Sequence, residues 1–353
     1  METTTLPVVR AGDDEALWQA CLAGGLFYLV DHNIDAGLIE KVLDESRLFF
    51  ARAQEEKSSL SIKKSIHHRG YGLLKNYRDW REQIHVGVEA QAGAPKGNIA
   101  QNQVEADYWK LWGPNQWPDG AFRQVITDYL KQVESLSGSL LTSLALKMGH
   151  NHDFFTERMK GRPYLLLKAI SYLPQELLQD TSEAMHTGVP AHCDWSWLTL
   201  LIQDQVGGLE AQDKEGNWHY VKPLPGSIVV NTGELLEIES GGQLVANPHR
   251  VINARIDRQR ISVPVFINPA LDSTIYPGGR QGADYKTRAC VGHPTSDAKA
   301  ELEADHIHKV IEPGAKVEPF FFGNSEYERK ERGNWCYRPQ CLGKVDLDLG
   351  TTL

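Results

Sequence analysis

The chain has 353 residues with 37 basic and 46 acidic side chains, a formal net charge of −9 and 41% hydrophobic residues. This composition is that of a globular protein and argues against a chain that is disordered throughout. The negative charge provides no attraction for nucleic acid or an anionic membrane surface, and no apolar run approaches the roughly 18 residues of a membrane-spanning helix.

The first 160 residues are predicted to be rich in helices, because apolar side chains recur there at helical spacing. The predicted helices cover residues 13–24, 36–52 and 121–149. Gly138 is a point at which the last of these helices could break. A short apolar strand is predicted over 27–30, and the polar stretch 57–120 is predicted to be mostly loop.

The second half of the chain changes to short apolar runs separated by turn residues. The predicted strands are 165–173, 197–203, 208–212, 217–222, 227–231, 249–253 and 260–268. Many short strands at this spacing are typical of a β-sandwich or barrel, and we interpret 165–268 as an antiparallel jelly roll. The expectation is therefore a single domain over 1–353, whose parts are a helix-rich segment 1–160, the jelly roll, an insertion loop 272–317 and a C-terminal segment 318–353 with a helix over 318–335.

The five cysteines are an odd number and show no CxxC spacing. The N-terminal residues have neither the basic start nor the apolar stretch of a signal peptide. Both features favour a reduced, cytoplasmic compartment. They leave the oligomeric state open.

His192 and Asp194 stand two positions apart at the start of an apolar strand, and His249 begins a later strand. Residues i and i+2 of a strand point to the same face, with Cα atoms roughly 6–7 Å apart, so an imidazole and a carboxylate can reach one ion. The pair alone would equally describe a polar strand end. Two histidines and one carboxylate, however, form the facial triad of non-haem Fe(II) oxygenases.

Arg260 and Ser262 repeat the i, i+2 spacing in the last predicted strand. A guanidinium can donate two parallel hydrogen bonds to a carboxylate, and the serine hydroxyl adds a donor on the same face. Taken alone, Arg260 would be better interpreted as a surface residue of a strand. Beside a metal site, the pair predicts a site for a carboxylate.

Several segments match one family in the same order. HCDWSWLTLLIQ and RISVPVFINP match its HxD and RxS segments, and NTGE at 231–234 matches its NxGD turn. Upstream, LFYLVDHNI, FFARAQEEK, RGYG with DWREQ, and GPNQWPD also match. Over most of residues 15–270 the chain thus resembles the iron- and 2-oxoglutarate-dependent dioxygenases of the isopenicillin N synthase-like group. The resemblance implies a mainly β fold, a double-stranded β-helix (jelly-roll, cupin-like) core with surrounding helices.

The resemblance also implies roles for the residues above. His192, Asp194 and His249 would bind Fe(II), and Arg260 with Ser262 would hold the distal carboxylate of 2-oxoglutarate, with O₂ as the second cosubstrate. The expected reaction is oxidation of a small molecule by hydroxylation, desaturation or ring formation, coupled to decarboxylation of 2-oxoglutarate to succinate.

One segment departs from the family pattern. The family's Asn-Tyr-Tyr-Pro stretch, whose first and third positions often contact the cosubstrate, reads Ser171-Tyr172-Leu173-Pro174 here. Ser171 can still donate a hydrogen bond to 2-oxoglutarate, but Leu173 cannot. The inner contacts of the cosubstrate are therefore expected to differ from those of the family.

Four further residues are expected to face the substrate, namely Trp195, Phe266, Tyr71 and His85. Trp195 follows the metal ligands, Phe266 continues the alternation that begins at Arg260, and the other two lie in the region that resembles the family's lid. For Trp195 and Phe266, packing in the core or at the rim is the alternative. The expected substrate is a metabolite or natural product, and the sequence does not name it.

Two other functions stay open at this point. The first is an Fe(II) oxidase of the same fold that needs no 2-oxoglutarate, which the Leu173 departure keeps open and a test for succinate would decide. The second is a jelly-roll binding protein without catalysis, against which the complete set of three ligands argues. Iron content and O₂ uptake would distinguish this second alternative from an enzyme.

Overall fold

The computed structural model describes most of the first 273 residues and short pieces beyond them. The described residues are 6–75, 80–93, 107–173, 187–252, 258–273, Ile275, Gly278, 285–287, 309–311, 316–318 and 338–340. The predicted insertion loop and C-terminal segment, including the helix predicted over 318–335, therefore lie largely outside the described residues. Within them the structure describes two antiparallel pairs, β13 (Tyr285–Thr287) with β14 (Lys309–Ile311) and β15 (Lys316–Glu318) with β16 (Arg338–Gln340).

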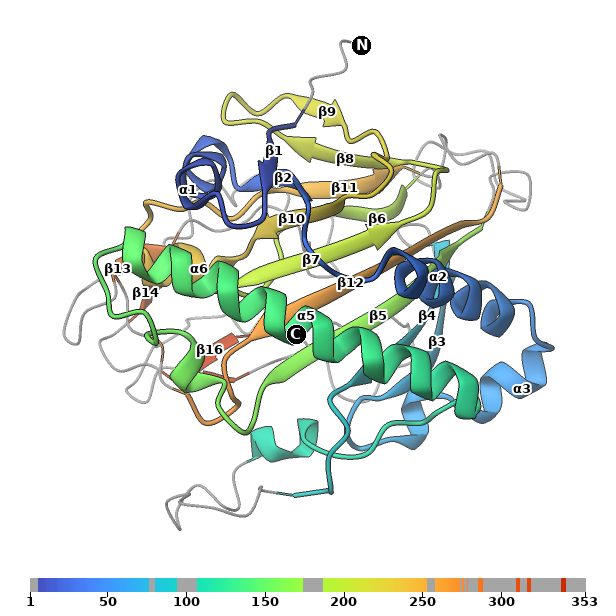
Figure 1. Ribbon diagram of the computed structural model, residues 1–353. Helices are drawn as coiled ribbons and strands as arrows, with labels where there is room; N and C mark the ends of the chain where they lie inside the picture. The colour runs from blue at the N-terminus through green and yellow to red at the C-terminus, as the bar shows by residue number, and fades with distance from the viewer. Residues whose placement is uncertain are drawn as a thin grey trace, which may run out of the picture.

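The largest element is an eight-stranded sheet (Figure 1). In sheet order its strands are β1 (Val8–Arg10), β2 (Leu26–Val30), β10 (Ile228–Thr232), β7 (Leu198–Gln203), β12 (Arg260–Asn268), β5 (Tyr164–Tyr172), β4 (Trp80–Gly87) and β3 (Gly70–Lys75). Only the β1–β2 pair is parallel among the strand pairs of this sheet. Four of the strands, β1 to β4, come from the first 160 residues, so the sheet extends well beyond the predicted jelly-roll segment.

A smaller antiparallel sheet faces one side of the large one. Its strands are β6 (Thr187–His192), β11 (His249–Ile252), β8 (Leu209–Gln212) and β9 (Trp218–Tyr220), in that order. From β5 to β12 the chain passes back and forth between the two sheets, with β8 and β9 as the one hairpin within the smaller sheet. Eight antiparallel strands wound in this way are a jelly roll, so the predicted double-stranded β-helix is confirmed.

Helices cover the other side of the large sheet. They are α1 (Asp14–Ala23), α2 (Ala36–Phe50), α3 (Gln54–Ser59) and α5 (Gly120–Lys147), with α6 (Glu234–Glu239) after β10 and three short 3₁₀ turns at Ile62–Lys64, Asp107–Leu111 and Thr156–Arg158. Figure 1 shows α5 crossing the sheet in front of β12 and β5. The Asp119 side chain caps α5 by accepting a hydrogen bond from the backbone N–H of Phe122, and the helix runs unbroken past Gly138.

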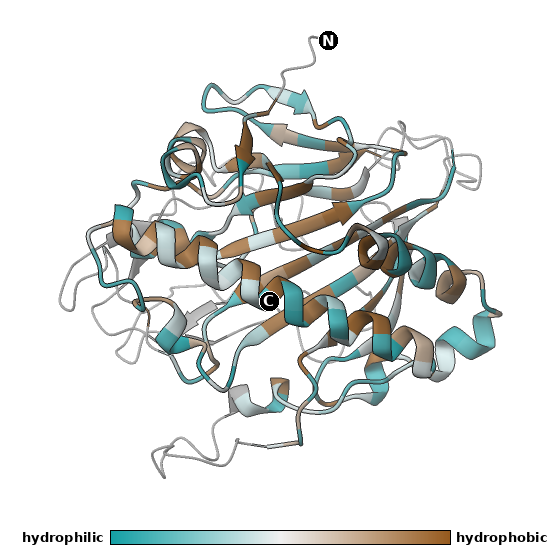
Figure 2. Ribbon diagram, in the orientation of Figure 1, coloured by the Kyte–Doolittle hydropathy of each residue, from teal (hydrophilic) through white to brown (hydrophobic). Residues whose placement is uncertain are grey.

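Along the central strands, successive side chains point alternately into the core beneath the helices and into the cavity between the sheets. On β5, Leu165, Leu167 and Ala169 are buried in the cluster shared with α5, while Ile170 and Tyr172 face the smaller sheet. The central strands are correspondingly brown in Figure 2, and the helices carry teal residues along with their apolar ones. No helix in the described part of the chain is both long and apolar enough to cross a membrane.

The loop prediction over residues 57–120 is wrong where β3 and β4 form. On β4, Ile84 and Val86 are buried against the helices, whereas Arg81 and Gln83 line a cavity between the sheets. The second face of β4 is polar because it borders a cavity, so its sequence resembles that of a solvent-exposed segment. For this reason the sequence pattern did not predict a strand here.

Candidate metal and cosubstrate site

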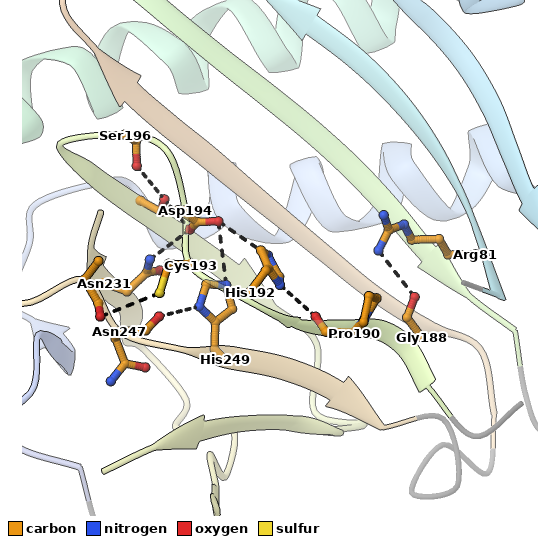
Figure 3. Close-up of polar contacts among 12 residues, drawn as sticks. Arg81, Gly188, Pro190, His192, Cys193, Asp194, Ser196, Asn231, Asn247 and His249 are labelled. Atoms are coloured by element: carbon orange, nitrogen blue, oxygen red, sulfur yellow. Dashed lines mark hydrogen bonds and ion pairs between the residues drawn. The ribbon is translucent and has the colours of Figure 1, made fainter. Parts of the chain in front are cut away.

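The three predicted metal ligands lie together at one end of the cavity between the sheets (Figure 3). His192 ends β6 and His249 begins β11, and these two residues are direct partners in the antiparallel ladder. Asp194 lies in the turn that follows β6, with Oδ1 placed 3.5 Å from Nε2 of His192 and 3.7 Å from Nε2 of His249. One ligand atom from each residue lies within 4.8 Å of the others, which is a spacing that one ion can bridge.

Neighbouring groups fix which atoms face the ion. Nδ1 of His192 lies 2.9 Å from the carbonyl oxygen of Pro190, and Nδ1 of His249 lies 3.0 Å from that of Asn247. Because a carbonyl oxygen only accepts, each Nδ1 carries the hydrogen, and each Nε2 presents a lone pair toward Asp194. This arrangement is the one that metal-binding histidines adopt.

The carboxylate of Asp194 is oriented by two neutral donors. The Thr199 hydroxyl donates to its Oδ2 at 2.6 Å, and the Asn231 side-chain amide donates to the same oxygen at 2.8 Å. Thr199 and Asn231 are register partners on β7 and β10, so their side chains lie side by side next to the carboxylate. Oδ1 is thereby left for an ion. The sequence analysis missed both donors, although a buried polar residue inside each apolar strand was the available signal.

The protonation states also suit a divalent metal. Burial raises the pKa of the Asp194 carboxyl, but His249, His192 and the Thr199 hydroxyl outweigh it and lower the pKa below its usual range. Burial lowers the pKa of His249, against the opposing charge of Asp194. At neutral pH the site therefore offers an ionised carboxylate beside a neutral imidazole, which are the forms that bind metal.

The turn that carries Asp194 is held against the first turn of α6. The backbone N–H of Glu234 donates to the carbonyl of Asp194 at 2.8 Å, and that of Gly233 donates to the carbonyl of Trp197 at 3.0 Å. A Cβ on Gly233 would lie 2.2 Å from the carbonyl oxygen of Ser196, so only glycine fits this close approach. The NTGE segment therefore acts as a structural support for the ligand turn, as its resemblance to the NxGD turn implied.

Arg260 and Ser262 line the same cavity from β12. Arg260 is 1% exposed, its Nη2 donates to Oε1 of Gln203 at 2.8 Å, and its guanidinium carbon lies 4.8 Å from the centre of the Tyr172 ring. Its Nε and Nη1 are buried and have no hydrogen-bond partner among the residues that the structure describes. A buried cation with unused donors is costly unless an anion completes it, so the site fits a carboxylate such as that of 2-oxoglutarate.

Comparisons with known proteins agree with this geometry. Residues 166–269 match the model of the 2OG-Fe(II) oxygenase superfamily, and residues 14–120 match that of the non-haem dioxygenase in morphine synthesis N-terminal. A homoarginine-6-hydroxylase of Arabidopsis thaliana is 30% identical over 292 residues, which cover 79% of this chain and 86% of the relative. The chain belongs to the 2-oxoglutarate- and Fe(II)-dependent oxygenases.

Other members of this superfamily extend the comparison. The 2-oxoglutarate-Fe(II) type oxidoreductase hxnY of Emericella nidulans is 30% identical over 263 residues, covering 71% of this chain and 72% of the relative. A full-length Neurospora crassa protein crystallised with alpha-ketoglutarate and thymine has the same fold, with a TM-score of 0.64 at 20% identity over 88% of this chain and 94% of that chain. As an oxygenase of this superfamily, the chain oxidises a small molecule with O₂ and converts 2-oxoglutarate to succinate.

The structure corrects the expectation for Ser171 in this oxygenase. Alternate residues of a strand point to opposite faces, and Ile170 and Tyr172 are the β5 residues that line the cavity here. Ser171 is fully buried on the other face, where its hydroxyl accepts a hydrogen bond from Gln259 Nε2 at 2.9 Å. Tyr172, which the sequence analysis did not select, is the neighbour of Arg260 in this segment.

Two of the four predicted substrate residues also lie elsewhere. Tyr71 is buried in the main core, where its hydroxyl donates to Oε2 of Glu82 at 2.9 Å and its ring contacts Phe49. Trp195 packs against the same core and is absent from the cavity wall. For Trp195 the alternation of the ligand strand does not continue, because the chain turns between β6 and β7 instead of remaining extended.

Phe266 and His85 lie on the side of the large sheet that faces the cavity. Phe266 lines the cavity and is the register partner of Thr199, the donor to Asp194. His85 is a buried residue of β4 with the same parity as Arg81 and Gln83, and its register partner on β5 is Lys168. Phe266 therefore lies near the proposed metal ligands. His85 is on the same side of the sheet, next to Lys168, but is not among the residues that line the cavity.

Proposed function

We propose that His192, Asp194 and His249 bind Fe(II) and that Arg260 with Ser262 binds the distal carboxylate of 2-oxoglutarate. The observation that carries this proposal is the convergence of two imidazole Nε2 atoms and one carboxylate oxygen in a cavity that also holds an incompletely paired guanidinium. A metal with three protein ligands keeps positions open for a cosubstrate and O₂.

In this arrangement the bound Fe(II) supplies O₂-dependent oxidation coupled to decarboxylation of 2-oxoglutarate. The residues of the chain position the reactants. Thr199 and Asn231 keep one oxygen of Asp194 directed at the ion, and Arg260 fixes the far end of the cosubstrate. The apolar strands around them exclude water from the reacting groups.

The substrate is proposed to be a free small molecule. The net charge of −9 supports this choice over nucleic acid, whose phosphates an acidic chain would repel. The cavity lies between the two sheets and is lined by about as many apolar as polar side chains, which suits an organic compound better than a polymer.

The decisive experiment needs no knowledge of the substrate. The purified chain is supplied with Fe(II) and 2-oxoglutarate, and succinate, O₂ consumption and bound iron are measured. We expect one equivalent of iron and slow succinate formation without added substrate. Asp194→Ala should lose both, while the surface variant Asp128→Ala, which removes a carboxylate from the exposed side of α5, should retain both.

Three outcomes would contradict the proposal. A full equivalent of tightly bound iron in Asp194→Ala would show that the ligands are elsewhere. Oxidation of a substrate without succinate would indicate the oxidase that needs no 2-oxoglutarate. Neither iron nor O₂ uptake in the wild-type chain would indicate a binding protein.

A further inference from the structure

The cavity has a second group of polar side chains that neither the metal nor the cosubstrate accounts for. Arg81 and Gln83 reach it from β4, and Lys168 reaches it from β5. Lys168 is half-buried, and its Nζ lies 4.8 Å from the centre of the Phe266 ring, a contact that holds the ammonium on the cavity side of the sheet. We call these three residues the basic wall.

The described lining of the cavity contains few acidic side chains. Among the described residues that line the cavity, Asp194 is the only acid, and its carboxylate is committed to the metal site. Farther along β4, close to Gly87, the guanidinium of Arg69 is buried and donates to the backbone carbonyls of His67 and Leu111, which are uncharged partners.

The pKa of His85 is affected by the cationic side chains around it. Burial lowers the pKa of its imidazole well below the usual range, and Lys168, Arg69 and Arg81 lower it further. The histidine therefore stays neutral at neutral pH. In this partly desolvated space, an ion pair between a ligand and a cationic side chain is stronger than at the surface.

The proposed function assigns both carboxylates of 2-oxoglutarate to groups outside the basic wall. In the proposed function one carboxylate is held at Arg260 and the other end of the molecule lies at the metal. Arg260 stands on β12, and β5 separates it from β4, so its Cα lies about 10 Å from that of Arg81 on the ladder. The register places Lys168 four residues along β5 from Tyr172, the residue that packs on Arg260.

We propose that the substrate is an organic acid whose carboxylate pairs with Lys168 on the basic wall and whose apolar body lies against Phe266. This inference rests on the proposed function, because it places the substrate beside the metal site. Arg81 adds attraction for the same carboxylate, and Gln83 offers an amide donor between the two cations. The apolar body follows from the cavity's aliphatic and aromatic residues, among them Ile170 and Leu201.

The proposal separates this chain from the relatives named as homoarginine hydroxylases. Homoarginine carries a guanidinium, and a site for it requires an acid on the wall. The described part of the cavity offers no carboxylate besides Asp194. We therefore expect this chain to discriminate against a guanidinium-bearing compound and in favour of a simple acid.

Binding of matched probes tests the charge requirement. The chain is loaded with Mn(II) and saturating 2-oxoglutarate, so that Arg260 is occupied and no turnover occurs. Isothermal titration calorimetry then compares benzoate with benzamide, 3-phenylpropanoate with 3-phenylpropanamide, and octanoate with octanamide. At least one acid should bind, and it should bind about tenfold or more tightly than its amide. Homoarginine should bind more weakly than that acid.

Variants of the basic wall locate the carboxylate. Lys168→Gln should weaken the acid about 10- to 100-fold and leave its amide unchanged, while Lys168→Arg, which keeps the charge, should recover most of the affinity. Arg81→Gln should weaken the acid by a smaller factor. The matched control is Lys131→Gln, since Lys131 is an exposed lysine of α5. Circular dichroism and the melting temperature establish that each variant is folded.

The outcomes separate this inference from the function on which it rests. Failure of every acid to bind, equal binding of acid and amide, tighter binding of homoarginine, or an acid affinity unchanged in Lys168→Gln would each overturn the organic-acid proposal. If 2-oxoglutarate binding and succinate formation persist in such a case, only the substrate assignment is lost. If the wild-type chain binds neither metal nor 2-oxoglutarate, the proposed function itself fails.

Discussion

Replacement of Arg260 by methionine is the sharpest test of the cosubstrate site. Methionine keeps much of the aliphatic length beside Tyr172 and removes all of the guanidinium donors. Among the residues that the structure describes, only Gln203 pairs with the guanidinium, through Nη2, so Nε and Nη1 can donate to a carboxylate. A charge-assisted hydrogen bond contributes about 1.5–3 kcal/mol, and a two-point pair that loses about 3 kcal/mol weakens binding roughly 100-fold.

Titration of 2-oxoglutarate into the Mn(II)-loaded protein measures this loss directly. Arg260→Met should raise the dissociation constant about 100-fold, and Ser262→Ala should raise it less than tenfold because one neutral hydroxyl is lost. Arg10→Met is the control, since Arg10 is an exposed arginine of strand β1, which lies four strands away from β12 in the sheet order. A dissociation constant within threefold of wild type in Arg260→Met would refute the assignment, as would substrate oxidation without 2-oxoglutarate.

Three further variants test the supports of the metal site and the core. Asn231→Leu removes a donor to Asp194 and should lower Fe(II) affinity about 10- to 100-fold in a metal titration, with the melting temperature little changed. Gly233→Ala forces a Cβ against the carbonyl oxygens of Ser196 and Asp194, so we expect lower bound iron and a lower melting temperature together. Trp195→Ala should lower the melting temperature by several degrees and leave 2-oxoglutarate binding unchanged, because the indole packs on the core; a selective kinetic defect would place it at the substrate instead.

The proposed metal ligands could be selected from the sequence because two of them have the spacing that places both side chains on one face of a strand. His192 and Asp194 are close neighbours along the chain, and the family resemblance singled out His249 as the third. The orientation of Ser171 was not predictable in this way. It depends on which face of β5 meets the smaller sheet, and a shift of one residue exchanges the two faces. The local sequence of β5 is apolar on both sides of Ser171, so the pattern contains no signal for its direction.

The strands could be predicted from the sequence where they are mostly apolar. The prediction failed where a strand borders the cavity. β7 and β12 are mostly apolar because both faces are buried, with Thr199 and Ser262 as polar interruptions. β4 has three consecutive polar residues, Arg81, Glu82 and Gln83, and its cavity face resembles solvent-exposed surface. A search for apolar strand patterns therefore misses the strand positions that face the cavity. Thr199 and Asn231 were missed for the same reason, as single polar residues inside strands that otherwise read as core.

The cavity takes its walls from distant parts of the chain. Arg81 and Gln83 lie within the segment that matches the N-terminal family model, while the three metal ligands and Arg260 lie within residues 166–269. The β3–β4 hairpin is also at the edge of the large sheet, with a neighbour on one side only. If the basic wall binds the substrate, mutations in this hairpin are expected to change which compounds bind while the metal and cosubstrate residues stay unchanged. A hairpin exchanged between two relatives would therefore be expected to transfer selectivity in one step, which makes this edge a natural point of divergence in the superfamily and a practical target for directed evolution.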